Sequence, residues 1–361
     1  MPEFVYQYRP LLIVVYLLGV FSLLSILFIL STILVRIYHI YSYRRQERLQ
    51  ERFTQILFDF LENPRSRRPV REIRTSREKE DFFKFCLHYL EILKGTDHQK
   101  ILDLLVLLDI PIHLIQNLRH HNRWRRAYAA YFLGELRFQP AMDALRKAMS
   151  DKFYLVQFYA TKSIIQIQDQ TYLREAILKL FRIPDLSSYQ IKEALIELSE
   201  ENMELAREIF RNEELDEDQK KIFVDLFAYR RYQPAAEDIL LTLVDTTHRE
   251  LKIACIRALG LLNYTPAIEF LHTLLKEEDW VVKSQVYRAL GRIGDLGSLS
   301  EFLDSIKSPN FWIRYNAALA LYDLGSVGIN YLKKIFSDLD HPGHEIAEQI
   351  LVEKKVLIGE K

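Results

Sequence analysis

Residues 251–260 read LKIACIRALG, and the same arrangement returns as VKSQVYRALG at 282–291 and as IRYNAALALY at 313–322. The three copies are spaced 31 residues apart, and each opens with an aliphatic residue followed by a base. Apolar and small residues then recur at the spacing of one helix face, which predicts a buried amphipathic helix rather than a strand. A fixed period of this length indicates a solenoid of stacked repeats.

Turn-forming residues between the copies predict that each repeat holds two helices. Asn263 and Gly294 each follow the end of a copy by three residues, and both residue types tolerate the left-handed conformation that ends a helix. Pro266 suits the first turn of a second helix, which we expect over 267–276, with Thr265 as its cap. Each repeat is therefore a helical hairpin that needs its neighbours to bury its apolar faces.

The pattern extends in both directions. Further copies, some of them weak, begin at or near Arg125, Val156, Gln190, Gln219 and His344. We predict an all-α fold in which residues 98–361 form a right-handed α-solenoid of about eight antiparallel helical hairpins, with 99–118 as a candidate ninth. The pattern resembles the short HEAT-like repeats named after phycobilisome lyases over residues 98–352. That resemblance implies the architecture and leaves the function open, because this repeat serves many functions.

The composition excludes one class of partner and one kind of framework. The chain has 361 residues, with 49 Lys or Arg and 49 Asp or Glu, so its formal net charge is zero. No overall positive field draws it to nucleic acid, and we expect no nucleic-acid partner. Its two cysteines, Cys86 and Cys255, lie among apolar helix residues, which predicts buried thiols and no disulfide.

An apolar segment near the N-terminus predicts a membrane anchor. The segment begins at Leu11, ends at Val35 and contains no charged residue, and it is long enough to form a single transmembrane helix. A signal peptide is the alternative, but its apolar region would be shorter and a small-residue cleavage site would follow it. Five arginines follow the segment: Arg36, Arg44, Arg45, Arg48 and Arg52. By the positive-inside rule, residues 1–10 lie outside and the solenoid lies in the cytoplasm.

Residues 36–97 are predicted to hold juxtamembrane helices, an Arg-rich linker and a helix that caps the solenoid. A helical apolar stripe continues from the anchor to Pro64, and Thr75 with Glu78 forms a capping box that starts the next helix. The linker carries five arginines: Arg65, Arg67, Arg68, Arg71 and Arg74. We expect these to contact anionic lipid head groups, with a simple solvated linker as the alternative.

Two charged clusters within the solenoid are candidate partner-binding sites. The basic cluster comprises Arg119, Arg123, Trp124, Arg125 and Arg126. Arginine clusters recognise acidic groups, such as carboxylates of a partner or lipid phosphates. The acidic cluster comprises Glu213, Glu214, Asp216, Glu217 and Asp218. It suits a basic partner, and an ordinary solvated surface is the alternative for both clusters.

Large aromatic residues precede several of the predicted first helices. They are Trp124, Tyr154, Trp280, Phe311 and Trp312. We predict that they pack in the seams between repeats, because equivalent positions of stacked repeats touch one another and large rings fill such seams. A ligand-binding aromatic ladder is the alternative.

These patterns predict a membrane-tethered scaffold that binds a protein partner on a concave wall lined by the second helices, in a membrane or envelope assembly complex. The familiar catalytic motifs are absent from the sequence. Deoxyhypusine hydroxylases, similar in repeat fold, hold iron with several His-Glu pairs, whereas this chain has only His344-Glu345. We therefore expect no catalytic residue, cofactor, metal or small-molecule substrate. The alternative is a HEAT-repeat enzyme of the lyase or metal-dependent hydroxylase type.

Overall fold

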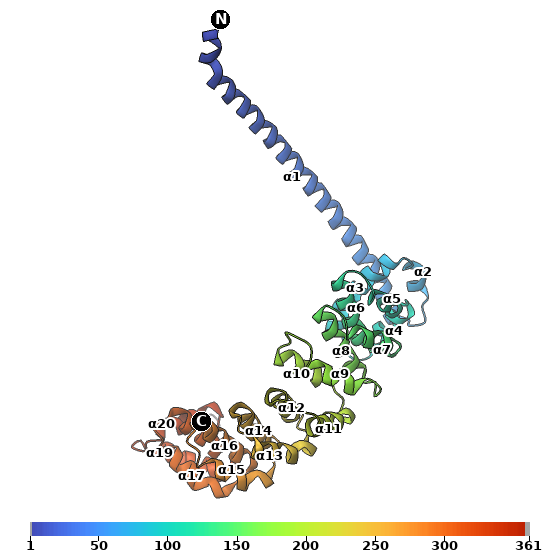
Figure 1. Cartoon of the computed structure of the whole chain (residues 1–361). Coiled ribbons are helices and arrows are strands. Elements are labelled where there is room, and N and C mark those ends of the chain that lie inside the picture. The colour runs from blue at the N-terminus through green and yellow to red at the C-terminus, as the bar shows by residue number, and fades with distance from the viewer. Residues whose placement is uncertain (1, 358–361) are drawn as a thin grey trace. The chain divides into compact units, whose positions relative to one another are not determined.

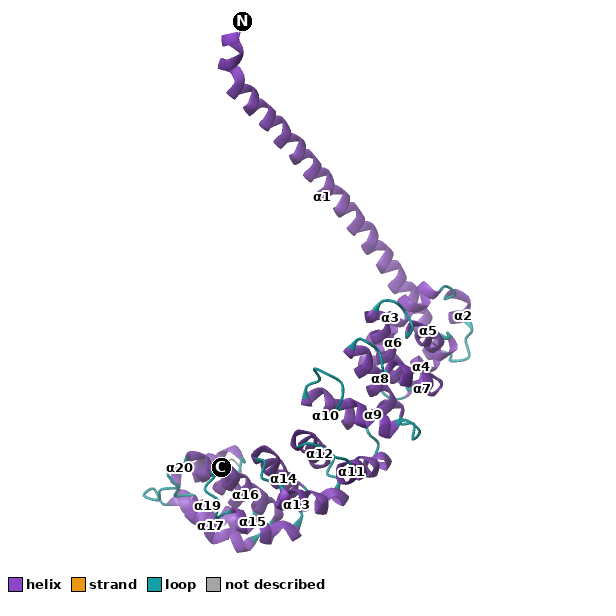
Figure 2. Cartoon of the chain, in the orientation of Figure 1, coloured by secondary structure: helices purple, strands orange, loops and turns teal. Residues whose placement is uncertain are grey.

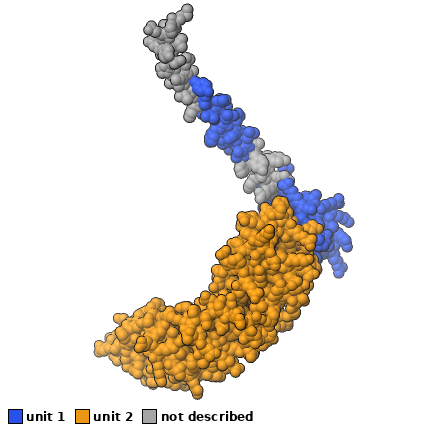
Figure 3. Space-filling model, in the orientation of Figure 1, with its two compact units in different colours: residues 1–113 blue, residues 114–361 orange. Residues whose placement is uncertain are grey.

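The computed structural model describes residues 2–357, apart from the side chains of 2–15, 17, 21, 37–46 and 91. Every regular element in this range is a helix and none is a strand, as Figure 2 shows. The all-α prediction is thus confirmed. The chain divides into two compact units, Met1–His113 and Leu114–Lys361 (Figure 3), and the division falls within α5 (Ile110–Asn117).

Unit 1 begins with one long helix, α1 (Pro2–Glu62), drawn in blue in Figure 1. The predicted anchor, residues 11–35, lies within this helix. Within α1, the stretch Leu18–Arg36 has the length and the apolar composition of a helix that could cross a membrane. None of this stretch is buried in the protein. The helical stripe predicted to continue as far as Pro64 belongs to the same helix.

The other helices of unit 1 pack around the end of α1. They are α2 (Arg68–Glu72), α3 (Ser76–Ile92) and α4 (Thr96–Leu107). Phe53 and Ile56 of α1 are buried, and the ring of Phe53 meets that of Phe82 on α3 edge to face, with 5.2 Å between centroids. At the start of α3, the Thr75 side chain accepts from the N–H of Glu78, and the Glu78 side chain accepts from the N–H of Thr75. This confirms both the apolar stripe and the capping box.

Unit 2 is an array of helix pairs, each a first helix followed by a second one. The pairs are α6 (Arg123–Glu135) with α7 (Met142–Ala148), α8 (Tyr154–Ile167) with α9 (Leu173–Leu180), α10 (Ser188–Ile196) with α11 (Met203–Asn212), α12 (Glu217–Tyr229) with α13 (Ala236–Asp245), α14 (Arg249–Leu261) with α15 (Ile268–Leu274), α16 (Trp280–Ile293) with α17 (Leu299–Ser305), and α18 (Phe311–Asp323) with α19 (Ser326–Ser337). Helix α20 (His344–Glu353) follows the last pair. The copies predicted from sequence therefore all fall in helices, and the repeated hairpin is confirmed.

The helix ends follow the predicted turn chemistry with one exception. Asn263 and Gly294, which follow α14 and end α16, have positive φ angles of 51° and 84°. Pro266 lies in the 3-10 turn Thr265–Ala267 that leads into α15, as predicted. The prediction that Thr265 caps this turn is wrong. The N–H of Ala267 instead bonds to the backbone carbonyl of Tyr264 at 3.2 Å, so the turn needs no side-chain acceptor.

Unit 2 curves toward its first helices. A Cβ added to Gly260 would lie 2.7 Å from the Cα of Ala289, and one added to Gly291 would lie 2.6 Å from the Cα of Ala320, so the backbones of successive first helices nearly touch. Helices on the inner side of a curved stack lie closer together than those on its outer side. Accordingly, α8, α10, α12 and α14 follow the concave side of unit 2 in Figure 1, with α9, α11 and α13 on the convex side. The prediction that second helices line the concave wall is therefore wrong.

Candidate functional site

A groove crosses the concave side of unit 2 over three consecutive first helices, α10, α12 and α14. Its volume is about 440 Å³. It is lined by Tyr189, Lys192, Glu193, Ile196, Asp225, Leu226, Ala228, Tyr229, Arg257 and Leu261. Because three repeats contribute to its walls, the groove exists only when the repeats are stacked.

The helical period decides which side chains of α12 reach the groove. Phe223 and Phe227 are fully buried in the core, so Asp225 and Tyr229, two residues further along in each case, emerge on the opposite face. Tyr229 is 67% exposed, and Tyr189 on α10 is 73% exposed. An exposed tyrosine offers an apolar ring with a polar tip, a combination enriched at protein interfaces.

Charged side chains tie the three helices of the groove together. The side chain of Asp225 is only 17% exposed. Its carboxylate lies 3.2 Å from Nζ of Lys192 on α10 and 2.6 Å from Nη2 of Arg257 on α14. Asp225 thus pairs with cations from the repeats on both sides. The groove therefore combines apolar walls with charges held in place, which suits the binding of a side chain together with its polar neighbours.

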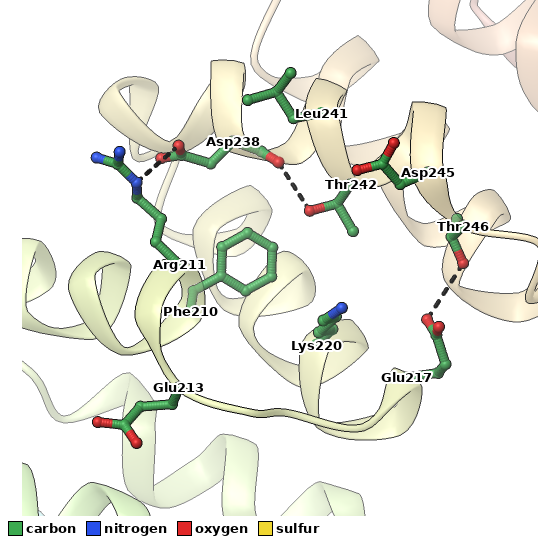
Figure 4. A pocket seen from close by; sticks show the side chains of 10 residues that line it. All are labelled: Phe210, Arg211, Glu213, Glu217, Lys220, Asp238, Leu241, Thr242, Asp245 and Thr246. Carbon is green, nitrogen blue, oxygen red and sulfur yellow. Dashed lines mark hydrogen bonds and ion pairs between the residues drawn. The ribbon is translucent and has the colours of Figure 1, made fainter.

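A second cavity, of about 340 Å³, lies among α11, α12 and α13 (Figure 4). Its lining includes Glu213 and Glu217, two members of the predicted acidic cluster. Figure 4 shows Arg211 directed at Asp238, 3.4 Å away, and Thr246 donating to Glu217 at 3.2 Å. Acids and bases both line this cavity and several already pair with each other. The concave groove, whose walls add two exposed tyrosines and several aliphatic side chains, is the stronger candidate site.

The predicted basic cluster surrounds the N-terminus of α6. Four members are exposed: Arg119, Arg123, Trp124 and Arg125. The guanidinium of Arg123 stacks over the ring of Phe153, 4.8 Å from its centroid. Arg126 differs, because it forms two hydrogen bonds of 2.7 and 2.9 Å with the carboxylate of Asp151 in the next repeat. The members of the basic cluster therefore lie near one another, and Arg126 already has a partner within the array. Binding of an external partner by this cluster stays a prediction.

The predicted acidic cluster lies before α12 and in its first turn. Asp216 caps this helix, and its side chain accepts a hydrogen bond of 2.8 Å from the N–H of Gln219. Glu213 pairs with Arg174 at 2.7 Å. Three members are exposed: Glu214, Asp216 and Asp218. Much of the acidic charge therefore has a local structural role, and recognition of a basic partner stays a prediction.

The arginines predicted to contact lipid belong to unit 1. Four are exposed: Arg65, Arg67, Arg71 and Arg74. Arg68 opens α2 and pairs with Glu72 at 2.6 Å and also with Asp59. Ile73 is buried, so the segment from Pro64 to Ser76 is folded rather than a plain linker. The contact with lipid stays a prediction.

Several aromatic residues ahead of the first helices are exposed, so the prediction that they fill the seams is wrong for Trp280 and Trp312. The ring of Trp124, although exposed, meets that of Phe153 in the next repeat edge to face, with 5.2 Å between centroids. Trp124 is 57%, Trp280 is 41% and Trp312 is 53% exposed. These tryptophans lie in the first turns of α6, α16 and α18, where a side chain points back toward the helix N-terminus and has no preceding turn to cover. Small residues such as Gly260 and Ala289 occupy the seam instead.

Cys86, Cys255 and His344 belong to residue types that bind metals or take part in redox chemistry, but each of them is packed against other groups of the protein. Burial raises the pKa of the Cys86 thiol well above its usual range and that of Cys255 to about 12, so neither thiol is reactive at neutral pH. The ring of His344 stacks on that of Phe336, with 5.5 Å between centroids. Among the described residues, no group of three or more His, Cys, Asp and Glu side chains could hold a metal ion.

The residues that line the groove carry no distinctive sequence signal of their own. On the outer face of an amphipathic helix, charged residues are expected whether or not they bind anything. Their position within the repeat could have indicated them. Asp225, Arg257 and Arg288 are each the seventh residue of their copy, so they form a column along the array. A column of charges over consecutive repeats indicates a continuous surface.

Comparison with known proteins identifies the repeat. A profile described as HEAT repeats matches residues 236–321 and 273–349, so this part of the chain contains HEAT repeats. The search of curated proteins gave no match.

Solved structures to which this chain is similar include crystal structures of the karyopherin Kap121p. The complex with Pho4p has 14% identity and a TM-score of 0.49, covering 79% of this chain and 38% of that one. The complex with Nup53p has 14% identity and a TM-score of 0.47, with the same coverage. An engineered protein has 15% identity and a TM-score of 0.34, covering 78% of this chain and 81% of that one. The chain thus spans 38% of the length of Kap121p.

Proposed function

We propose that this chain is a membrane-tethered scaffold whose repeat array binds a protein partner. The observation that carries the proposal is the concave groove across α10, α12 and α14. Its exposed tyrosines and its arginine, Arg257, belong to the residue types that are enriched at protein interfaces. The HEAT repeats within residues 236–349 support it as well, since stacked repeats create extended concave surfaces for binding.

The N-terminal segment supports the tether. An anchor at residues 11–35, followed by five arginines, would hold the array at the cytoplasmic face of the membrane. A partner captured there gains effective concentration without any new contact. The proposed array is a right-handed solenoid of about eight antiparallel hairpins, counting α20 as a truncated last copy, and its repeats resemble the short phycobilisome-lyase type.

The topology can be tested with single cysteines. On intact cells that express the chain, a membrane-impermeant thiol reagent should label a cysteine placed at Glu3 and spare one placed at Ser66. The native Cys86 and Cys255 are fully buried, so background labelling should be small. Both introduced cysteines should react after permeabilisation. Labelling at Ser66 alone in intact cells would reverse the proposed orientation.

Binding in the groove can be tested by photo-crosslinking in the full chain. A photoreactive phenylalanine derivative at Tyr229 should crosslink a protein that mass spectrometry identifies, because this exposed side chain lines the groove. The matched control carries the same group at Glu269, which is exposed on the second helix α15. Equal capture from both positions, or none from Tyr229, would contradict the proposal.

A further inference from the structure

Arginines of two successive first helices lie at one border of the groove. Arg257 of α14 lines the groove, and Arg288 occupies the same position on α16, 31 residues later. The charges of both, and that of Arg231, act on Arg292, which is also on α16. Two of them have carboxylate partners in the array: Arg257 lies 2.6 Å from Asp225, and Arg288 lies 2.8 Å from Asp323. With Lys192 of α10, these cations outnumber the carboxylates of Asp225, Asp323 and Glu193, the last of which lines the groove and pairs with Lys162. This border of the groove therefore favours a ligand with negative charge.

Arg292 is the member of this group best placed to bind such a ligand. It is half-buried on α16, and among the described residues it forms no ion pair. Its burial, and then the charges of Arg288, Arg257 and Arg231, lower the pKa of Arg292, although Asp323 opposes them. A carboxylate supplied by a ligand would offset this repulsion and could accept two parallel hydrogen bonds from the guanidinium.

The distance between Arg292 and the groove determines how many residues must separate the two contact side chains of the ligand. Arg292 occupies on α16 the position that Leu261 occupies on α14, 31 residues earlier. Packed helices lie about 8–10 Å apart. An extended chain covers this distance in about three residues. A segment with one side chain in the groove therefore reaches Arg292 with a side chain about three residues away.

We propose that the partner offers an acidic segment, with an apolar or aromatic side chain against Tyr229 and Leu261 and a carboxylate on Arg292. This inference rests on the proposed function, since it assigns chemistry to the partner of the same groove. A peptide fits better than a nucleic acid, because the carboxylates of Asp225 and Asp323 would repel a continuous row of phosphates. The neutral net charge of the chain agrees with this choice.

The test is a selection of short displayed peptides, each with one fixed tryptophan, on the full chain in detergent micelles. Selected peptides should be enriched in Asp or Glu about three residues from the tryptophan. Their affinity should fall about tenfold or more on Arg292→Glu and should weaken as salt rises. Arg182→Glu makes the same charge change at an exposed position after α9 and should leave the affinity nearly unchanged. Arg292→Gln provides a second variant if Arg292→Glu does not fold.

Other results would overturn one of the two proposals. Absence of selected peptides, peptides without acidic enrichment, or full affinity in a folded Arg292 variant would overturn the acidic segment. So would a single-stranded oligonucleotide that binds tightly and loses its binding on Arg292→Glu. The crosslink from Tyr229 separates the two proposals. A specific crosslink to a segment without acidic residues would keep the scaffold and overturn the acidic segment, whereas no crosslink would overturn the scaffold.

Discussion

Replacement of Gly291 by valine should lower the free energy of unfolding of unit 2 by about 3 kcal/mol. Gly291 lies where α16 meets α18, and an added Cβ would be 2.6 Å from the Cα and 2.9 Å from the carbonyl oxygen of Ala320. Backbone atoms cannot rotate away as the end of a long side chain can, so the two helices must separate. Urea unfolding followed by circular dichroism measures the change.

Gly291→Ala is a sharper variant, because two effects then have opposite signs. Helix propensity alone predicts stabilisation by about 1 kcal/mol, whereas the contact with Ala320 predicts destabilisation. Coupling in a solenoid passes between neighbouring repeats, so hydrogen exchange should become faster in both α16 and α18. A more stable alanine variant, or loosening confined to α16, would contradict the packing described here.

Asp151→Ala should cost about 2 to 3 kcal/mol. The side chains of Asp151 and Arg126 are only 14% and 16% exposed, and their two hydrogen bonds join successive repeats. Asp151 also accepts from the N–H of Phe153 at 2.9 Å, at the start of α8. The alanine variant therefore loses three hydrogen bonds and leaves a largely buried guanidinium without its carboxylate. Urea unfolding of the variant and the wild type measures the difference.

The matched control for Asp151→Ala is Asp304→Ala. Asp304 pairs with Lys307 at 3.6 Å, but its side chain is 82% exposed. Exposed pairs of this kind contribute little, so the control should change stability by less than about 0.5 kcal/mol. Equal losses from the two variants would show that burial of the Asp151 pair is not what makes it stabilising.

The Asp151 pair should also make stability depend on pH in the acid range. Partial burial acts to raise the pKa of Asp151, but hydrogen bonds from Arg126 and from the Phe153 N–H outweigh it, so the pKa is lowered. A carboxyl with a depressed folded-state pKa stabilises fully above its ordinary pKa of about 3.9 and less as pH falls through the folded-state value. The difference between wild type and Asp151→Ala should therefore be constant near neutral pH and shrink below about pH 4. A difference that stays constant in strong acid would argue against this linkage.

The sequence by itself determined the repeated hairpin and its local details. Apolar spacing located the helices, Asn263 and Gly294 marked two helix ends, and Thr75 with Glu78 marked the start of α3. These features depend on the helical period, on backbone conformations open to a few residue types, and on hydrogen bonds within one turn. All of them are local, so a short window of sequence contains the information.

Only the tertiary structure decided which way unit 2 curves and which residues meet on its concave side. The exposure of Trp280 and the contact of Asp225 with Lys192 and Arg257 depend on how one repeat sits on the next. That placement is the sum of close contacts between different repeats. Each of these residues has the ordinary pattern of an amphipathic helix in its own repeat, and its surroundings arise only when the repeats stack.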